Sequence, residues 1–139
     1  MEQREKDSLI QAAKLAAINS KAFKSKFEVG CAIRVEYGTM HDYRIVKGAN
    51  LEFNGHPALH AEVAALSNLF LNDCRPHDVV ALCVYCPTGT HWPCYCCLQA
   101  LVSHLPGTVL IIAASPEGVQ EETLENLTQY AYKGRQDAT

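Results

Sequence analysis

Three stretches of the chain repeat hydrophobic residues at the spacing of an α-helix. In residues 5–19 the apolar side chains share one face and charged residues lie opposite. Residues 59–71 carry a similar stripe, and residues 94–104 follow Pro93, a residue favoured at a helix start. A shorter acidic segment, residues 121–127, is also predicted to be helical. The first two stripes consist of Leu9, Ala12, Ala13, Ala16 and Ala17, and of Leu59, Val63, Leu66 and Phe70.

Four other stretches have the composition of β-strands. Residues 27–35 and 43–49 flank a turn at Gly38, so we expect them to pair antiparallel. Residues 79–86 and 108–114 are nearly continuous apolar runs, typical of strands buried on both faces. A predicted helix lies between these two runs, which indicates a parallel pair joined by a right-handed crossover. The pattern therefore predicts an α/β domain with a mixed sheet between helical layers.

Composition is that of an ordinary globular protein. Residues 1–139 suffice for a single domain, with 48% apolar and 19% charged residues. The net charge of −3 and an isoelectric point near 6.0 provide no basic surface for a polyanion. They favour a small, weakly charged substrate over nucleic acid. Three clustered lysines, Lys21, Lys24 and Lys26, leave room for a local basic patch.

The N-terminal residues and the cysteines indicate where in the cell the protein is located. Residues 1–8 are charged and lack the apolar core of a secretory signal, and no apolar run reaches membrane-spanning length. The seven cysteines are an odd number, so a disulfide framework is not expected. These features predict a cytoplasmic protein without membrane partners.

The strongest chemical signal is a pair of motifs, H-x-E at residues 60–62 and P-C-x-x-C at residues 93–97. The pair supplies one imidazole, His60, and two thiolates, Cys94 and Cys97, a donor set that suits one Zn²⁺ per chain. Zinc held by three protein ligands keeps a fourth position for water, which is typical of a catalytic site. Both motifs lie at predicted helix starts, where the helix dipole favours the thiolate form of the cysteines.

Glu62 has two interpretations. As an acidic residue in the first turn it complements the helix dipole. As a carboxylate beside the metal, but not bound to it, it can shuttle protons during hydrolysis. Zinc lowers the pKa of a bound water to about 7 in favourable sites and so supplies hydroxide as a nucleophile.

The alternative for the metal is a structural site closed by a fourth protein ligand. The candidates are Cys31, Cys86, His91 and Cys96. Cys86 lies with Cys83 at an apolar strand, where burial in the core is the expected role. Cys96 falls between the two ligands and is expected to point away from a metal that both share. A catalytic site is therefore the preferred interpretation.

The two motifs resemble the signature of zinc-dependent base deaminases. Residues 26–32 resemble the F-x-V-G-A-A strand of free-nucleoside cytidine deaminases, residues 48–52 their G-x-N-x-E segment, and residues 126–132 their C-terminal E-L-L-P-x-A-F end. The sequence is thus identified as a member of the cytidine deaminase superfamily. The resemblance implies a three-layer α/β/α sandwich on a mixed, five-stranded sheet. It also implies hydrolysis of cytidine or deoxycytidine to the uridine and ammonia, with zinc-bound hydroxide attacking C4 and Glu62 shuttling protons.

The same resemblance assigns substrate contacts. Phe27 would pack against the pyrimidine, and the backbone of Ala61 would meet the base. Asn50 and Glu52 would hold a ribose hydroxyl. Trp92 would lie near the amino group of the base.

Oligomerisation is a further implication of the resemblance. Small members of the family are homotetramers whose active sites are completed across interfaces, so a tetramer is expected ahead of a dimer. An aromatic residue near the C-terminus, Tyr130 or Tyr132, would line the pocket of a neighbouring subunit.

The sequence also departs from the family pattern. His60 replaces the first of three cysteines, and Val63 stands where small members carry an arginine. The loss of the arginine is consistent with the change from cysteine to His60. A neutral imidazole and two thiolates balance the charge of zinc, so no arginine is needed to offset a third thiolate. Residues 92–99 lose the glycine and arginine of S-P-C-G-x-C-R-Q, and the loop before His60 is slightly shorter than usual.

Three rival functions remain open on the sequence alone. One is deamination of a base in single-stranded nucleic acid, which Trp92 beside the P-C motif faintly suggests. Another is deamination of a blasticidin S-type aminonucleoside or an N4-modified cytidine. The third is a non-catalytic, zinc-stabilised binding module, which the intact Glu62 disfavours.

Overall fold

The computed structural model describes residues 1–39 and 41–133. The helices are α1 (Gln3–Ala17), α2 (Ala61–Leu71), α3 (Tyr95–His104) and α4 (Leu124–Leu127). The strands are β1 (Gly30–Glu36), β2 (Tyr43–Ala49), β3 (Val79–Tyr85), β4 (Leu110–Ser115) and β5 (Gly118–Thr123), with a 3-10 turn, Pro76–Asp78, before β3. Of the helices in this described part, none has the length and apolar character to cross a membrane.

The five strands form one mixed sheet in the order β2-β1-β3-β4-β5. β1 pairs antiparallel with β2 and with β3, and β4 pairs antiparallel with β5. β3 and β4 are parallel, with α3 in the crossover between them. The predicted parallel pair and the predicted antiparallel pair are both confirmed.

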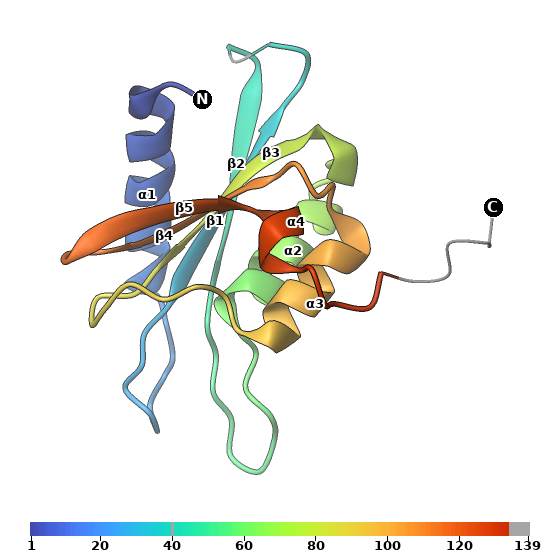
Figure 1. Cartoon of the computed structure of the whole chain (residues 1–139). Helices are drawn as coiled ribbons and strands as arrows, with labels where there is room; N and C mark the ends of the chain where they lie inside the picture. The colour runs from blue at the N-terminus through green and yellow to red at the C-terminus, as the bar shows by residue number, and fades with distance from the viewer. Residues whose placement is uncertain (40, 134–139) are drawn as a thin grey trace.

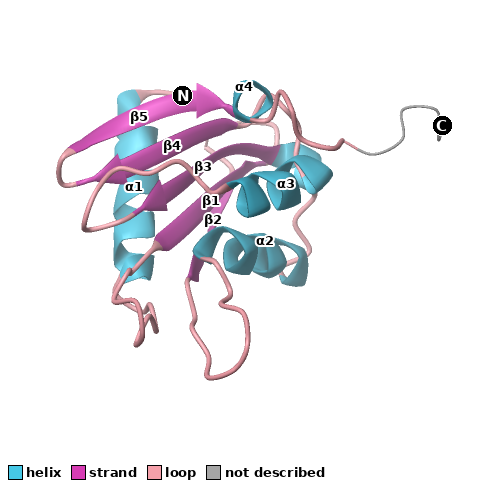
Figure 2. Ribbon diagram, turned by 60° about the horizontal axis from the view of Figure 1, so that its bottom comes forward, coloured by secondary structure: helices cyan, strands magenta, loops and turns pink. Residues whose placement is uncertain are grey.

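Helices cover both faces of this sheet (Figures 1 and 2). α1 packs on one face, whereas α2 and α3 pack on the other. Because side chains alternate along a strand, β1 serves both layers. Cys31 and Ile33 belong to the core beneath α2 and α3, and Ala32 belongs to the core around Leu9 and Ala13 of α1. The three-layer α/β/α sandwich is confirmed.

Two glycines let helices approach the sheet closely. A Cβ atom at Gly30 would lie 2.0 Å from the backbone oxygen of Ala13 in α1. A Cβ atom at Gly48 would lie 2.3 Å from the backbone nitrogen of Ala65 and 2.7 Å from the backbone oxygen of Ala61, both in α2. The absence of a side chain at Gly48 therefore sets how closely the start of α2 approaches β2.

The predicted acidic helix over residues 121–127 is confirmed for residues 124–127 and wrong for residues 121–123. Residues up to Thr123 form β5, and only Leu124–Leu127 are helical. A two-residue turn after Ser115 brings β5 back along β4, from Ser115 paired with Gly118 to Leu110 paired with Thr123. Backbone pairing with β4 thus overrides a polar pattern, since most of this edge strand faces solvent and carries no apolar alternation.

Other boundaries differ by a few residues. β1 begins at Gly30 instead of residue 27, because Lys26 has a positive φ of 60° and residues 27–29 are held by side-chain contacts described below. The polar C-terminal segment is described as far as residue 133, and residues 134–139 lie outside the described residues.

Candidate active site

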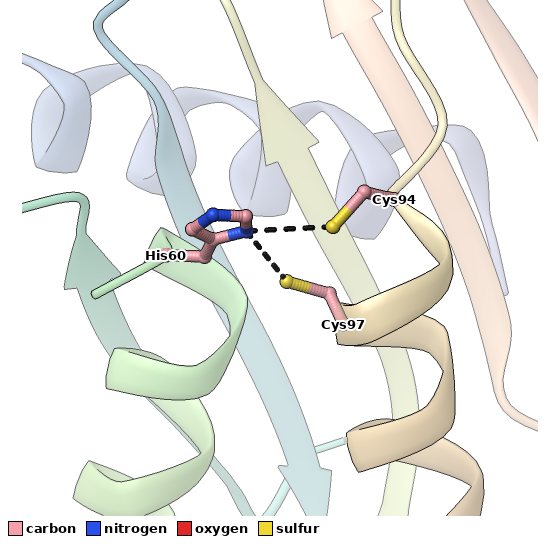
Figure 3. A group of neighbouring side chains, drawn as sticks. All are labelled: His60, Cys94 and Cys97. Atoms are coloured by element: carbon pink, nitrogen blue, oxygen red, sulfur yellow. Dashed lines mark hydrogen bonds between the residues drawn. The ribbon is translucent and has the colours of Figure 1, made fainter. Parts of the chain in front are cut away.

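Two helix starts bring three metal-binding side chains together (Figure 3). His60 is the N-cap of α2, Cys94 is the N-cap of α3, and Cys97 lies in the first turn of α3. The His60 Nδ1 atom lies 3.4 Å from Cys94 Sγ and 3.2 Å from Cys97 Sγ. All three donor atoms lie within 4.8 Å of one another. The side chains are therefore positioned to bind one metal ion.

The spacing of these donors fits zinc. Tetrahedral Zn²⁺ has Zn–N distances of about 2.0–2.1 Å and Zn–S distances of about 2.3 Å, which place neighbouring nitrogen and sulfur donors about 3.5 Å apart. The two distances from His60 Nδ1 are close to this value. Nitrogen and sulfur are also the donor types that zinc prefers.

The alternative of a structural site with a fourth protein ligand is not supported by the geometry. Within residues 1–39 and 41–133, the metal-binding group contains His60, Cys94 and Cys97 alone. The four candidates for a further ligand, Cys31, Cys86, His91 and Cys96, lie outside it. Three protein ligands leave a coordination position for water or substrate.

The thiol of Cys97 is not made acidic by its helix position alone. Burial, followed by the charge of the Glu62 carboxylate, raises the pKa of the Cys97 thiol above its ordinary value. These two effects oppose the thiolate form that the helix start is expected to favour. The positive charge of a metal ion opposes both effects, so deprotonation of Cys97 is coupled to metal binding.

Glu62 lies in the first turn of α2, two residues after His60. Its side chain is almost fully buried, with 5% of the residue exposed, and yet it lines the pocket beside the metal donors. Burial raises the pKa of the Glu62 carboxyl, because it disfavours the charged form. A carboxyl group with a raised pKa can take up and release a proton closer to neutral pH.

A pocket of about 190 Å³ extends from the metal donors towards the end of β2. His60, Cys94 and Glu62 line one part of it. Its wall also contains four of the predicted substrate contacts, namely Phe27, Asn50, Glu52 and Ala61. Residues that are far apart in the chain thus surround one small-molecule site.

Asn50 holds the segment that carries Phe27. Its Nδ2 donates to the backbone oxygen of Phe27 at 2.7 Å, and its Oδ1 accepts from the backbone nitrogen of Val29 at 3.0 Å. The same Oδ1 accepts a hydrogen bond from the Ser20 hydroxyl. This amide therefore fixes the backbone of the pocket wall.

Glu52 holds the preceding turn in a similar way. One carboxylate oxygen accepts from the backbone nitrogens of Lys24 and Ser25, at 2.8 and 3.0 Å. The other accepts from the Ser25 hydroxyl at 2.5 Å. These hydrogen bonds, the one from the Ser25 side chain first, lower the pKa of the Glu52 carboxyl.

Trp92, a predicted substrate contact, is not among the described residues that line this pocket. Tyr132 does not line it either, and was predicted to line the pocket of a neighbouring subunit. Trp92 is partly buried and packs against the core beneath α2 and α3. Tyr132 is 69% exposed, and its backbone is held by the side chain of Gln99 on α3.

The sequence analysis missed two polar residues in the pocket wall. Ser25 lies between Glu52 and the Phe27 segment, and His91 lies in the connection from β3 to α3. His91 was considered only as a metal ligand. Its place three residues before Cys94 was the available signal, since the connection that delivers a metal donor also borders the site.

Comparison with known proteins agrees with this geometry. A family model described as the cytidine and deoxycytidylate deaminase zinc-binding region matches residues 3–113. The structure of cytidine deaminase from Burkholderia pseudomallei is similar, with a TM-score of 0.82 and 27% identity over 95% of this chain and 100% of that chain. No protein with a curated description matches the chain.

Two mycobacterial structures are similar as well. Cytidine deaminase from Mycobacterium tuberculosis gives a TM-score of 0.76 and 27% identity over 92% of this chain and 97% of that chain. Cytidine deaminase from Mycobacterium leprae gives a TM-score of 0.69 and 34% identity over 87% of this chain and 94% of that chain. The likeness extends over nearly the whole fold.

Proposed function

The chain belongs to the cytidine and deoxycytidylate deaminase family, and from this premise we propose that it hydrolyses free cytidine or deoxycytidine to the corresponding uridine and ammonia. The reaction is zinc-dependent, and residues 1–139 act as one catalytic domain. One observation supports this proposal most strongly. The metal donors, the buried Glu62 carboxyl and the polar residues that follow β2, Asn50 and Glu52, all border the same pocket.

The chain provides a metal site and a proton carrier for this reaction. His60, Cys94 and Cys97 would hold the zinc ion, which when bound would supply a water molecule whose pKa is lowered toward neutrality. Glu62 takes one proton from the attacking water and delivers it to the ring N3, and then takes the second proton from the new C4 hydroxyl and delivers it to the departing amino nitrogen. One water is consumed and one ammonia leaves, so the carboxyl group returns to its starting state.

The remaining pocket residues bind the nucleoside. Phe27 packs on the pyrimidine and the backbone of Ala61 meets its edge, whereas Asn50 and Glu52 face the sugar hydroxyls. Their common position in the pocket wall supports these roles. Because the Glu52 carboxylate already accepts from the Ser25 hydroxyl, a ribose hydroxyl would share or replace that hydrogen bond.

A homo-oligomer, with a tetramer ahead of a dimer, completes the proposal. Tyr130 and Tyr132 are 94% and 69% exposed, so both rings are available to a neighbouring subunit.

We also propose a reducing, cytoplasmic location. All seven cysteines are free of disulfide bonds, which supports this proposal.

Parallel ammonia-release assays test the function. The zinc-loaded protein is given cytidine, deoxycytidine, blasticidin S and a cytosine-containing single-stranded oligonucleotide. We expect turnover of the free nucleosides and none of the oligonucleotide, since the pocket is small and the net charge is −3. Turnover of only the antibiotic or only the oligonucleotide would replace the proposed substrate class, and no ammonia from any of the four would overturn the activity.

A further inference from the structure

Among the titratable side chains of the pocket wall, His91 is one that the reaction leaves without a role. It lies on the connection between β3 and α3, opposite the segment that carries Phe27. It is not part of the metal-binding group. Its ring nitrogens form no hydrogen bond with any described residue. The side chain therefore makes its contacts by packing, including packing against the Phe27 ring.

The His91 ring packs edge-on against the ring of Phe27. The ring centroids are 5.5 Å apart and the planes meet at 62°, the T-shaped arrangement that aromatic pairs prefer. Phe27 belongs to the connection before β1, and His91 to the connection after β3. The ring pair therefore joins two walls of the pocket that come from different parts of the chain.

The backbone of Phe27 is fixed, but its ring is not fixed by the same contacts. The backbone nitrogen donates to the Ser25 hydroxyl at 3.0 Å, and the backbone oxygen accepts from Asn50. The residue is nevertheless 42% exposed, so the ring has little enclosure. The contact with His91 restricts the ring where the backbone hydrogen bonds do not.

Gly89 provides the space that His91 occupies. A Cβ atom at position 89 would lie 3.2 Å from His91 Nε2 and 3.7 Å from Cε1. A side chain there would push the imidazole by a few tenths of an ångström. The imidazole therefore lies close to Gly89 as well as to the Phe27 ring.

We propose that His91 is a positioning residue that holds the Phe27 ring against the pyrimidine of the substrate. The inference rests on the proposed function, because it takes Phe27 as the ring that packs on the base. We expect packing on the base to contribute equally in the ground state and in the transition state, since it does not involve the reacting atoms. Its loss therefore raises KM and leaves kcat unchanged.

The test compares His91→Ala, which removes the ring, with His91→Phe, which keeps a ring but removes both nitrogens. For His91→Ala we expect KM for cytidine and Ki for uridine to rise about 2- to 12-fold, the factor equivalent to an aromatic pair of about 0.5–1.5 kcal/mol. We expect His91→Phe to stay near wild type. Gly89→Ala, which displaces the imidazole without removing it, should raise KM by a smaller factor.

The chain offers a matched control in a second ring pair of the same kind. Phe70 and His104 lie 5.3 Å apart at 69°, towards the ends of α2 and α3 that are remote from the metal donors. His104→Ala removes an equivalent contact outside the pocket, so KM and Ki should not change. Zinc content and melting temperature are measured for every variant.

Three results would overturn the inference. The first is unchanged KM and Ki in His91→Ala, and the second is an equal loss in His91→Phe, which would assign the effect to the ring nitrogens. The third is a fall in kcat together with zinc loss, which would make the role structural. Failure of the proposed function is distinguishable, because wild-type protein would then release no ammonia from cytidine at all.

Discussion

At the scale of single residues, Glu62 combines near-complete burial with a place beside the metal donors. Substitution by glutamine keeps the size of the side chain and removes its ability to carry a proton. We expect Glu62→Gln to bind zinc normally and to lose about 10²- to 10⁴-fold in kcat, the usual contribution of general acid–base catalysis. Elemental analysis and steady-state kinetics check both parts, and near-normal turnover would refute the proton-carrier role.

His60 is the only nitrogen donor of the metal group. We expect His60→Ala to lower zinc affinity by more than about 100-fold, beyond the 10- to 100-fold that outer-shell residues contribute. The matched control is Cys96→Ser, since Cys96 is exposed and lies between the two sulfur ligands without joining them. One zinc per chain in His60→Ala, or loss of zinc in Cys96→Ser, would contradict the assignment of ligands.

These residue-level features could largely be predicted from the sequence, because the spacing within each motif is local. His60, Glu62, Cys94 and Cys97 all lie within one turn of a helix start. Asn50 could be expected in the site only by resemblance. Its hydrogen bonds to the Phe27 segment could not be read from the chain, because the two residues are 23 positions apart.

At the scale of elements, two glycines set the separation between helices and sheet. We expect Gly30→Ala and Gly48→Ala each to lower the free energy of unfolding by about 1–3 kcal/mol, the cost of overpacking a close contact. The added methyl group of Gly48→Ala meets the backbone of Ala61, in the turn that carries His60 and Glu62. Only this variant should therefore also lower zinc affinity.

Urea denaturation and zinc titration of the two glycine variants measure these effects. Gly30→Ala is the matched control, because its methyl group meets α1 on the opposite face of the sheet. Lys47→Ala, an exposed substitution in the same strand as Gly48, controls for the change in strand composition. Equal zinc affinity in Gly48→Ala and Gly30→Ala would show that α2 keeps its position despite the added methyl.

The helices and strands that carry a hydrophobic pattern were predicted to within a few residues of their observed bounds. The strand β5, which carries no such pattern, was not predicted. The buried faces of α1, α2, β3 and β4 each leave a periodic or continuous apolar signal. β5 is an exposed edge strand whose pairing with β4 depends on backbone hydrogen bonds. Backbone pairing leaves little trace in side-chain polarity, so its residues resembled an acidic helix.

At the scale of the whole molecule, burial divides the seven free cysteines into two exposed and five buried thiols. Burial in the central strand β3 raises the pKa of Cys83 to about 12. Since a raised pKa keeps this thiol protonated below that value, it should not react at pH 8 while the protein is folded. We expect a thiol reagent to modify Cys96 rapidly, and Cys94 as well once zinc is removed.

Mass spectrometry after brief labelling checks this order of reactivity. Labelling of Cys83 should begin only in denaturant, together with global unfolding, because the strand lies inside the sheet between β1 and β4. Rapid labelling of Cys83 in the native protein would show that the central sheet opens locally. Labelling in the presence and absence of zinc provides the internal comparison for Cys94.

The sequence by itself determined the metal donors, the proposed proton carrier and the order of most helices and strands. Each of these depends on spacing within a short segment, where helix and strand geometry relates position directly to direction. The tertiary structure decided which residues border one pocket, and it added His91, which the sequence had offered only as a possible metal ligand. Phe27, Glu52 and His91 come from three separate connections. They meet because the sheet order places the ends of β1, β2 and β3 side by side, and contacts across a sheet are set by packing of the whole domain.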